Sequence, residues 1–178
     1  NIGVLFEYDP ATFTYTKKFD FSSSSGSSPV AELFLASNGK LYGTTEYGGG
    51  GSGFLGVLFE YDPINDIYTK KHEFGGDRIQ GGYPKGVLAE GQNGKLYGTT
   101  GYETGLVGMG TLFEFSLSTN TFVKKLDFSH APNGGNYYST FPDYNKTEFV
   151  QASNGKFYGI THSGGTFGKG TLFEFDPV

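Results

Sequence analysis

Cysteine and tryptophan are absent from the sequence, and arginine occurs once, as Arg78. The lack of cysteine excludes disulfides, thiolate metal sites and cysteine nucleophiles. One arginine, a net charge of −5 and no basic cluster argue against binding to nucleic acid through its phosphates. No apolar run approaches the roughly 20 residues of a membrane-spanning helix, so we expect no membrane insertion by this segment.

Glycine and aromatic residues are abundant instead. The 178 residues include 30 glycines, 18 phenylalanines and 13 tyrosines. Aromatic residues favour β-strands, and glycine favours the tight turns between them. No window shows a convincing helical period of apolar residues, so the composition predicts an all-β protein.

Two sequence motifs recur at a regular spacing. The first, GVLFEYDP or a variant of it, begins at residues 3, 56, 110 and 170, so that successive copies start 53, 54 and 60 residues apart. The second, NGKLYGTT or NGKFYGIT, occupies residues 38–45, 93–100 and 154–161. This period suits a four-stranded propeller blade with long loops and is too long for leucine-rich or ankyrin repeats.

We therefore predict a β-propeller-like array of three four-stranded antiparallel blades, forming a single repeat domain over residues 1–178. The units are expected at about 3–55, 56–109 and 110–169, followed by a final strand at 170–178. Because propellers usually need about four blades to close, three blades would leave open faces. We expect the chain to be part of a larger propeller or repeat array; the alternatives are assembly of several copies, or an open stack.

The strands of the middle unit are expected at 86–90, 95–100, 110–115 and 121–128. Asn93-Gly94 is typical of a two-residue hairpin turn in which both residues have positive φ. Residues 57–61 are apolar on both faces, which predicts a strand that is covered on both sides. The more polar segment 68–74, with its two lysines, is expected to be an outer edge strand.

The repeated NGKLYGTT, followed by GTLFEF or GVLFEYDP, resembles the GloVer tandem repeats of large bacterial surface or secreted proteins. The resemblance covers nearly the whole chain. The sequence departs from the pattern at Ser116-Leu117, which replace Asp-Pro, and in a longer linker at 129–146. The resemblance implies repeat architecture and a location outside the cell or on its surface, and it supplies no catalytic residues.

Loop tyrosines are the candidate ligand-binding residues. Tyr47 and Tyr102 occupy the same position in a glycine-rich loop of two units, and His162 lies in the corresponding loop of the third. Exposed tyrosine rings can stack on the C–H faces of sugars, so these three residues form a candidate carbohydrate site. The absence of tryptophan weakens this interpretation.

Other polar residues are assigned to the framework. Glu7, Glu60, Glu114 and Glu174 share one repeat position, which indicates a structural role because ligand sites seldom recur identically in every unit. No histidine pair has the spacing of metal ligands, and we expect no metal and no cofactor. Asn145 begins the sequon Asn-Lys-Thr and is the candidate glycosylation site.

Three functions remain open at this point. The first is an extracellular or cell-surface structural or adhesive module, which assembles with copies of itself or with further repeats, for instance in a filament. The second is a carbohydrate-binding propeller with glycans as partners. The third is a hydrolase or lyase, for which only the third unit offers unique polar residues, such as His130, Asp143 and Glu148. No catalytic motif is present, so we expect no enzymatic activity.

Overall fold

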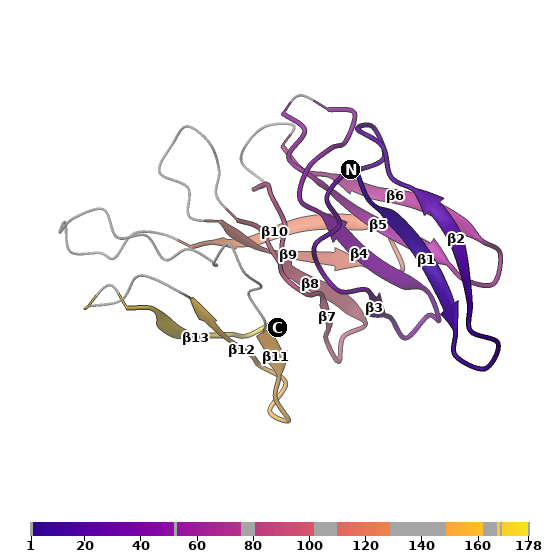
Figure 1. Cartoon of the computed structure of the whole chain (residues 1–178). Helices are drawn as coiled ribbons and strands as arrows, with labels where there is room; N and C mark the ends of the chain where they lie inside the picture. Colours follow the sequence, from indigo (N-terminus) through magenta and orange to yellow (C-terminus); the bar gives the residue numbers. More distant parts are fainter. Residues whose placement is uncertain are drawn as a thin grey trace.

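The computed structural model describes residues 2–51, 53–75, 81–101, 110–128, 149–161, 167 and 169–177. Within these ranges the chain forms thirteen β-strands and no helix, as the composition predicts. No helix long and apolar enough to cross a membrane occurs in these ranges. The strands form antiparallel sheets that follow one another in chain order (Figure 1).

Four sheets make up the described fold. The hairpin sheet contains β1 (Val4–Asp9) and β2 (Thr14–Asp20). The second sheet contains β3 (Phe34–Leu35), β4 (Leu41–Thr45), β5 (Val57–Asp62) and β6 (Ile67–Glu73). The third sheet contains β7 (Ala89–Glu90), β8 (Lys95–Thr99), β9 (Thr111–Ser116) and β10 (Thr121–Asp127). The fourth sheet contains β11 (Phe149–Gln151), β12 (Phe157–Thr161) and β13 (Thr171–Phe175).

The number of four-stranded sheets differs from the prediction of three. Two sheets have four strands, and they are flanked by sheets of two and three strands. The sequence units begin at a third strand, so each unit gives its first two strands to one sheet and its last two to the next. The strands predicted in the middle unit are confirmed as β7 to β10, and the polar strand β6 lies at a sheet edge as expected.

The Asn-Gly turns differ from the predicted two-residue type. Gly39, Gly94 and Gly155 have φ values of 80°, 70° and 81°, but the asparagines before them are not among the residues with positive φ. Ala36 N–H donates to Lys40 C=O, and Gly39 N–H donates to Ala36 C=O. This is a three-residue loop, a type I turn closed by a left-handed glycine, and it leaves the asparagine side chain free to bond within the sheet.

The first two Asp-Pro pairs, at 9–10 and 62–63, open the turn between a third and a fourth strand. Asp62 Oδ1 accepts the backbone N–H groups of Ile64 and Asn65 at 3.0 and 3.1 Å, and Asp9 Oδ1 accepts that of Ala11 at 2.8 Å. In the third sheet, Ser116 Oγ accepts the N–H of Thr119 instead. The departure from Asp-Pro at this position therefore keeps the turn, because serine closes it in the same way.

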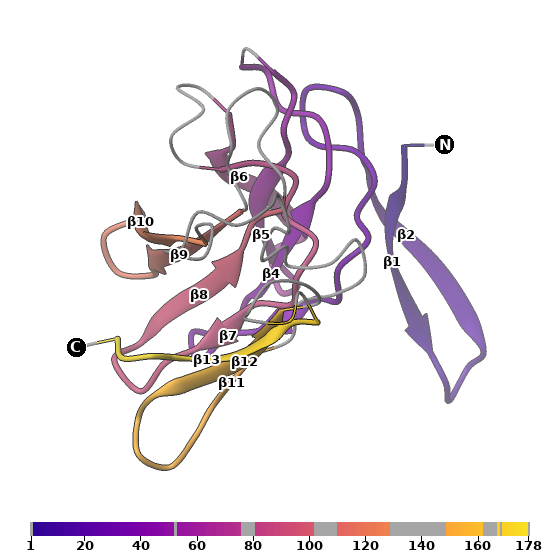
Figure 2. The same cartoon turned by 90° about the vertical axis from the view of Figure 1, so that its left-hand side faces the viewer.

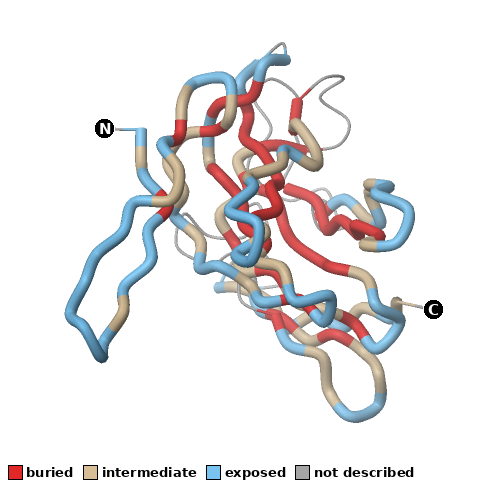
Figure 3. Tube along the Cα trace, turned by 90° about the vertical axis from the view of Figure 1, so that its right-hand side faces the viewer, coloured by how far each residue is buried: buried red, intermediate tan, exposed pale blue. Residues whose placement is uncertain are grey.

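Consecutive sheets pack face to face and leave the two end sheets more exposed (Figures 2 and 3). The face of a sheet toward the preceding sheet is called its front face, and the opposite face its back face. In β5, Val57, Phe59 and Tyr61 lie on the front face and pack on the hairpin sheet, whereas Leu58 lies on the back face and packs on the third sheet. Both faces of β5 are buried, as the sequence predicts.

One aromatic contact recurs at all three junctions between sheets. The third-strand phenylalanines Phe59, Phe113 and Phe173 meet a phenylalanine of the preceding sheet, with ring centroids 5.3, 5.4 and 5.3 Å apart. The contacted residues follow a fourth strand: Phe21, Phe74 and Phe128.

Each of these rings also lies over a glycine of its own sheet. Gly43, Gly98 and Gly159 pair across the sheet with the three phenylalanines. A Cβ atom added to Gly98 would stand 2.3 Å from Cζ of Phe113. The glycine of the repeated Tyr-Gly pair is therefore required by the ring, since a real Cβ atom does not fit in this space.

We predict that Gly98→Ala lowers the free energy of unfolding by about 1–3 kcal/mol, because the methyl group displaces a fully buried ring. The matched control is Gly50→Ala, whose Cβ would meet only Oε1 of Glu73, at 3.7 Å. It should leave stability unchanged within about 0.5 kcal/mol. Urea unfolding monitored by tyrosine fluorescence measures both, and equal effects of the two substitutions would contradict the assignment.

Candidate functional site

A polar network recurs at the middle of the second, third and fourth sheets, and we call it the carboxylate network. Its centre is the third-strand glutamate, which lies directly across the sheet from a second-strand tyrosine. In the third sheet, Tyr97 Oη donates to Glu114 Oε2 at 2.9 Å and Lys95 Nζ donates to Glu114 Oε1 at 2.6 Å. Asn93 completes the network, because its Nδ2 donates to Tyr97 Oη at 2.8 Å and its Oδ1 accepts the Lys95 N–H.

The same bonds are made in the second and fourth sheets. Glu60 accepts from Lys40 at 2.8 Å and from Tyr42 at 2.5 Å, and Asn38 donates to Tyr42. Glu174 accepts from Lys156 at 2.5 Å and from Tyr158 at 2.6 Å. The motif Asn-Gly-Lys-x-Tyr thus supplies three of the four residues of each network, and Phe-Glu supplies the fourth.

A second lysine reaches the network from the fourth strand through a β-bulge. The register between β5 and β6 shifts between Leu58 and Phe59, so that Lys71 is left without a partner across the ladder. Its Nζ lies 3.0 Å from Glu60 Oε2. Lys125 in β10 is bulged in the same way and lies 3.4 Å from Glu114 Oε2. A bulge re-aims a side chain, and here it turns one lysine of each Lys-Lys pair toward the buried carboxylate.

These contacts keep the buried glutamates ionised. Burial raises the pKa of Glu114, but hydrogen bonds from Lys95 and Tyr97 and the charge of Lys125 outweigh it and hold this pKa below its ordinary value. At Glu60, too, burial raises the pKa, but hydrogen bonds from Lys40, Tyr42 and Lys71 outweigh it and lower this pKa below its ordinary value. Burial raises the pKa of Tyr97 to about 12. Ionised, fully bonded and covered by the next sheet, Glu60 and Glu114 are framework residues, as their repetition in the sequence indicates.

Of the predicted carbohydrate-site residues, Tyr47 lies within the described part of the chain. Its ring is 44% exposed and meets the ring of Tyr83 edge to face, with centroids 5.5 Å apart. Its backbone pairs with that of Ser27. Tyr102, His162 and the predicted glycosylation site Asn145 lie outside the described residues, as do His130, Asp143 and Glu148.

Sequence reasoning did not identify Tyr83 as a partner of Tyr47. Tyr83 has a φ of 54°, a left-handed conformation that costs an ordinary residue of order 1 kcal/mol. Its N–H donates to Leu55 C=O at 2.7 Å, and its own C=O accepts from Gly101. The same conformation recurs at Ser28, which has a φ of 56° and, like Tyr83, stands directly before a proline.

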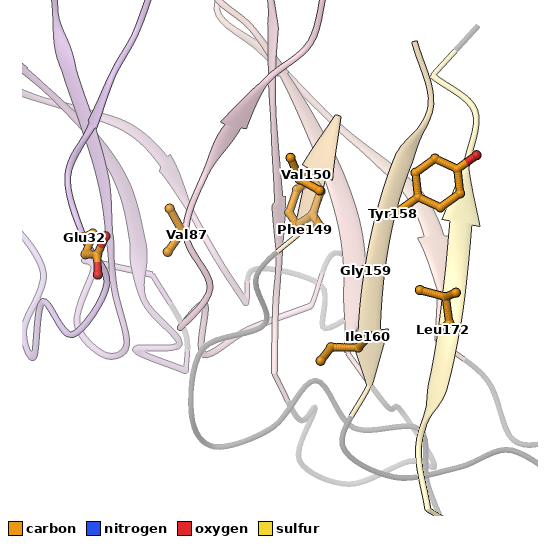
Figure 4. A pocket seen from close by; sticks show the side chains of 8 residues that line it. All are labelled: Glu32, Val87, Phe149, Val150, Tyr158, Gly159, Ile160 and Leu172. Carbon is orange, nitrogen blue, oxygen red and sulfur yellow. The ribbon is translucent and has the colours of Figure 1, made fainter. Parts of the chain in front are cut away.

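A cavity of about 570 Å³ opens on the back face of the fourth sheet (Figure 4). Its described lining is mainly apolar: Glu32, Val87, Phe149, Val150, Tyr158, Gly159, Ile160 and Leu172. Glu32 is the single carboxylate among them. Within the described residues, no three side chains of histidine, cysteine, aspartate or glutamate gather as metal ligands would. The cavity therefore offers a mainly apolar surface with one carboxylate, that of Glu32.

His72 has a role in packing that its position in a polar edge strand did not suggest. Its ring stacks on Phe122 of the third sheet, with centroids 3.7 Å apart and the planes 2° from parallel. Phe19 of the hairpin sheet occupies the same repeat position and stacks on Tyr68 of the second sheet at 3.9 Å. Two junctions between sheets therefore share this contact between fourth strands.

We predict that Glu114→Gln lowers the free energy of unfolding at neutral pH by about 2 kcal/mol, because charge-assisted bonds from two lysines are lost in a buried site. The matched control is Glu174→Gln, which changes the same network where its carboxylate is 45% exposed. The control should leave the melting temperature unchanged. A similar loss in both variants would mean that burial of the network does not contribute.

The pH dependence of stability follows from the lowered pKa values. Because Glu60 and Glu114 have a lower pKa in the folded than in the unfolded chain, their contribution is complete above the ordinary value of 4.5 and is lost as the pH falls through the folded values. We expect Glu114→Gln to lose less stability than the wild-type chain between neutral and acidic pH. Parallel pH profiles in urea unfolding would contradict this expectation.

The chain was compared with curated protein sequences and with solved structures. No curated protein sequence matches the chain. A solved structure of a puromycin-hydrolyzing peptidase from Mycobacterium tuberculosis is 14% identical, with a TM-score of 0.41 over 83% of this chain and 20% of the peptidase chain. The present chain thus spans a fifth of that protein's length.

The family comparison covers the whole sequence. The family model described as the Gloeobacter/Verrucomicrobia repeat matches residues 1–178. This agrees with the resemblance that the repeated motifs indicate. The chain belongs to the Gloeobacter/Verrucomicrobia repeat family.

Proposed function

We propose that this chain is a non-catalytic structural module, one sector of a β-propeller-like array, which joins further repeats of its own kind outside the cell or on its surface. The proposed mode of joining is the one seen inside the chain, the packing of one sheet's back face on the next sheet's front face. The proposed location follows the resemblance to the GloVer repeats of surface and secreted proteins.

The observation that carries the proposal is one six-residue sequence in two environments. VLFEYD forms both β1 and β5. In β5 the front-face residues Val57, Phe59 and Tyr61 are 0%, 1% and 3% exposed. Their counterparts Val4, Phe6 and Tyr8 in β1 are 42%, 55% and 52% exposed. The front face of β5 is buried because the hairpin sheet covers it. The same residues on the front face of β1 are exposed and form an apolar surface, and such surfaces often mark interaction sites.

The opposite end of the chain presents the complementary surface. On the back face of the fourth sheet, Leu172 is 74% exposed, whereas its counterpart Leu112 in the third sheet is fully buried. Val150 and Ile160 are also exposed on this face, at 65% and 66%, and line the cavity there. The two ends therefore carry the two halves of one interface, which elsewhere in the chain is closed.

An interface between two different faces is heterologous, so successive copies would add head to tail and form a ring or a filament. A ring of stacked sheets is the propeller architecture, and closed propellers have about four to eight blades. The described sheets, two complete and two partial, correspond to a sector of such a ring. The structural use of the recurring glutamates Glu60 and Glu114 supports a role without catalysis.

The test is self-association of the chain. We expect concentration-dependent association in sedimentation velocity, which either Phe6→Glu or Leu172→Glu should abolish, because each places a charge on one of the two faces. The matched control is Ile64→Glu at a turn, where the side chain is 88% exposed and lies outside both faces. Association that persists in both face variants would contradict the proposal, as would a strictly monomeric wild-type chain.

Mixing the two face variants tests the head-to-tail geometry. Phe6→Glu keeps an intact back face and Leu172→Glu keeps an intact front face. A mixture should therefore form one closed junction and stop at a one-to-one dimer, although neither variant associates alone. An interface between two identical faces would give no such rescue.

Carbohydrate binding is the second candidate, favoured by the contact of the exposed Tyr47 with the partly buried Tyr83. Two perpendicular rings on one loop surface provide both a face and an edge for the apolar side of a sugar. We expect Tyr47→Ala to abolish binding on a glycan array while leaving the melting temperature unchanged. An intact chain that binds no glycan would remove this candidate, and Tyr15→Ala, an exposed tyrosine of the hairpin sheet, is the control.

A further inference from the structure

We propose that Lys71 and Asn120 form an isopeptide bond, a covalent amide between their side chains, which joins the second sheet to the third. Such a bond goes beyond the packing of sheets, because it links two of them covalently within one chain. Lys71 Nζ donates to Asn120 Oδ1 at 2.9 Å and lies 3.0 Å from Glu60 Oε2. An amine, a side-chain amide and a carboxylate therefore meet at one point between two sheets.

The bulge in β6 brings Lys71 to this point. The shift in register leaves Lys71 without a partner across the ladder, and its side chain turns toward Glu60. The side chains of Lys71 and Glu60 are 14% and 7% exposed, so water has little access to the amine and the carboxylate. This burial matters because a lysine becomes a nucleophile when its amine is desolvated and loses its proton.

Asn120 is placed by the turn between β9 and β10. It has a φ of 53°, a left-handed conformation that asparagine tolerates better than most residues. Asp66 holds the same place in the second sheet, with a φ of 57°, but its Oδ1 accepts the hydroxyl of Tyr61 in its own sheet. The counterpart of Tyr61 in the third sheet is Phe115, which has no hydroxyl. The side chain of Asn120 reaches Lys71 of the preceding sheet instead.

The separation of the two reacting groups is short enough for attack. Because a C=O bond is about 1.2 Å long, the 2.9 Å contact with Oδ1 places Lys71 Nζ within about 4 Å of Asn120 Cγ. Reacting atoms in a near-attack arrangement stand about 3–3.5 Å apart, so a small side-chain rotation brings the amine to the carbon. Asn120 lies at an exposed turn, which gives the leaving group a path to solvent.

The reaction needs no reagent other than the chain itself. Lys71 Nζ passes one proton to the carboxylate of Glu60, and the freed electron pair attacks Cγ of Asn120. The Nζ–Cγ bond forms and the Cγ–Nδ2 bond breaks, while a second proton of Nζ moves to Nδ2, which leaves as ammonia. Glu60 returns its proton to the ammonia, which departs as ammonium. This happens once in each chain and turns over no substrate.

The surroundings of Glu60 decide how fast the bond forms. Glu60 is ionised and can accept a proton, but hydrogen bonds from Lys40, Tyr42 and Lys71 hold its pKa below the ordinary value. Proton transfer from lysine is therefore uphill, and we expect the bond to form slowly after folding. The chain has no cysteine, so no disulfide can join its sheets. An isopeptide bond would restrict the unfolded chain in the same way as a disulfide does.

The test is the intact mass of the folded chain, followed over time by mass spectrometry. We expect the mass to fall by that of one ammonia. Trypsin should then release residues 71–78 joined through Lys71 to residues 96–124. Lys71→Arg and Asn120→Ala should each keep the full mass. A folded wild-type chain that keeps its full mass would overturn the proposal, as would an ammonia loss that maps to an Asn-Gly pair instead of the joined peptides.

Matched variants separate the reacting lysine from its neighbours. Lys125→Arg changes the equivalent lysine of β10, and Lys40→Arg changes the other lysine that bonds Glu60, so both should still lose one ammonia. Glu60→Gln should slow bond formation by about a hundredfold or more, because its amide accepts no proton. The melting temperature shows whether this variant is folded, and bond formation at the wild-type rate would overturn the role of Glu60.

The outcome is separable from that of the proposed function. Phe6→Glu and Leu172→Glu abolish the proposed association of copies but leave Lys71 and Asn120 in place, so both variants should form the bond. Ammonia loss in a monomeric chain would support the isopeptide bond alone. Association of a chain that keeps its full mass would support the stacking of sheets alone.

Discussion

The third-strand glutamate, ionised and enclosed between two sheets, is the interaction on which the repeat depends. Removing a carboxylate from water is costly unless donors surround it. Here the donors come from two strands and a turn: Tyr97 and Lys95 from β8, Lys125 from β10, and Asn93, which holds the tyrosine. A register slip of one residue would turn the glutamate to the other face and leave all of these groups without partners.

The two irregular features of each sheet can be understood from this requirement. The type I turn with a left-handed glycine places the asparagine side chain over the second strand, where it bonds to the tyrosine. The bulge in the fourth strand directs one lysine of the pair inward, while the other, such as Lys124, stays at the surface and pairs with Asp127. The network thereby fixes both the turn before the second strand and the bulge in the fourth strand. The phenylalanine that precedes the glutamate in the third strand packs on the preceding sheet and connects the two sheets.

Much of the fold could be predicted from the sequence, because the repeats align the strands of different sheets. The strands of the middle unit, the burial of both faces of β5 and the turn formed by Asp62 follow from periodicity and turn chemistry. The family follows from the motifs. The bulge could not be predicted, because two adjacent lysines do not reveal which one faces inward. The left-handed conformation of Tyr83 was not predicted, although Ser28 adopts the same conformation before Pro29 at the equivalent repeat position.

The candidate site was less predictable than the fold. The recurrence of the glutamates indicated a structural role but did not reveal their partners. In each network the tyrosine and the glutamate that it bonds stand 16 to 18 positions apart in the chain. Two four-stranded sheets were found where three were predicted. The predicted units began at the GVLFEYDP motif, which forms the third strand of a sheet, so each unit combines strands of two different sheets. The packing role of His72 could not be predicted from the sequence, because the ring of Phe122 on which it stacks belongs to the neighbouring sheet.

The identity of β1 with β5 has a consequence for how the sheets find their neighbours. Strands with the same sequence cannot distinguish one another during folding, and repeat proteins are prone to exchange equivalent segments. The residues that differ between junctions therefore have to encode the order of the sheets. Phe19 meets Tyr68 at one junction and His72 meets Phe122 at the next, while Ser37 bonds to Glu90 and Gln92 bonds to Gln151. The shared motif builds each sheet, and the order of the sheets has to depend on contacts such as these, which recur from junction to junction but join different residues.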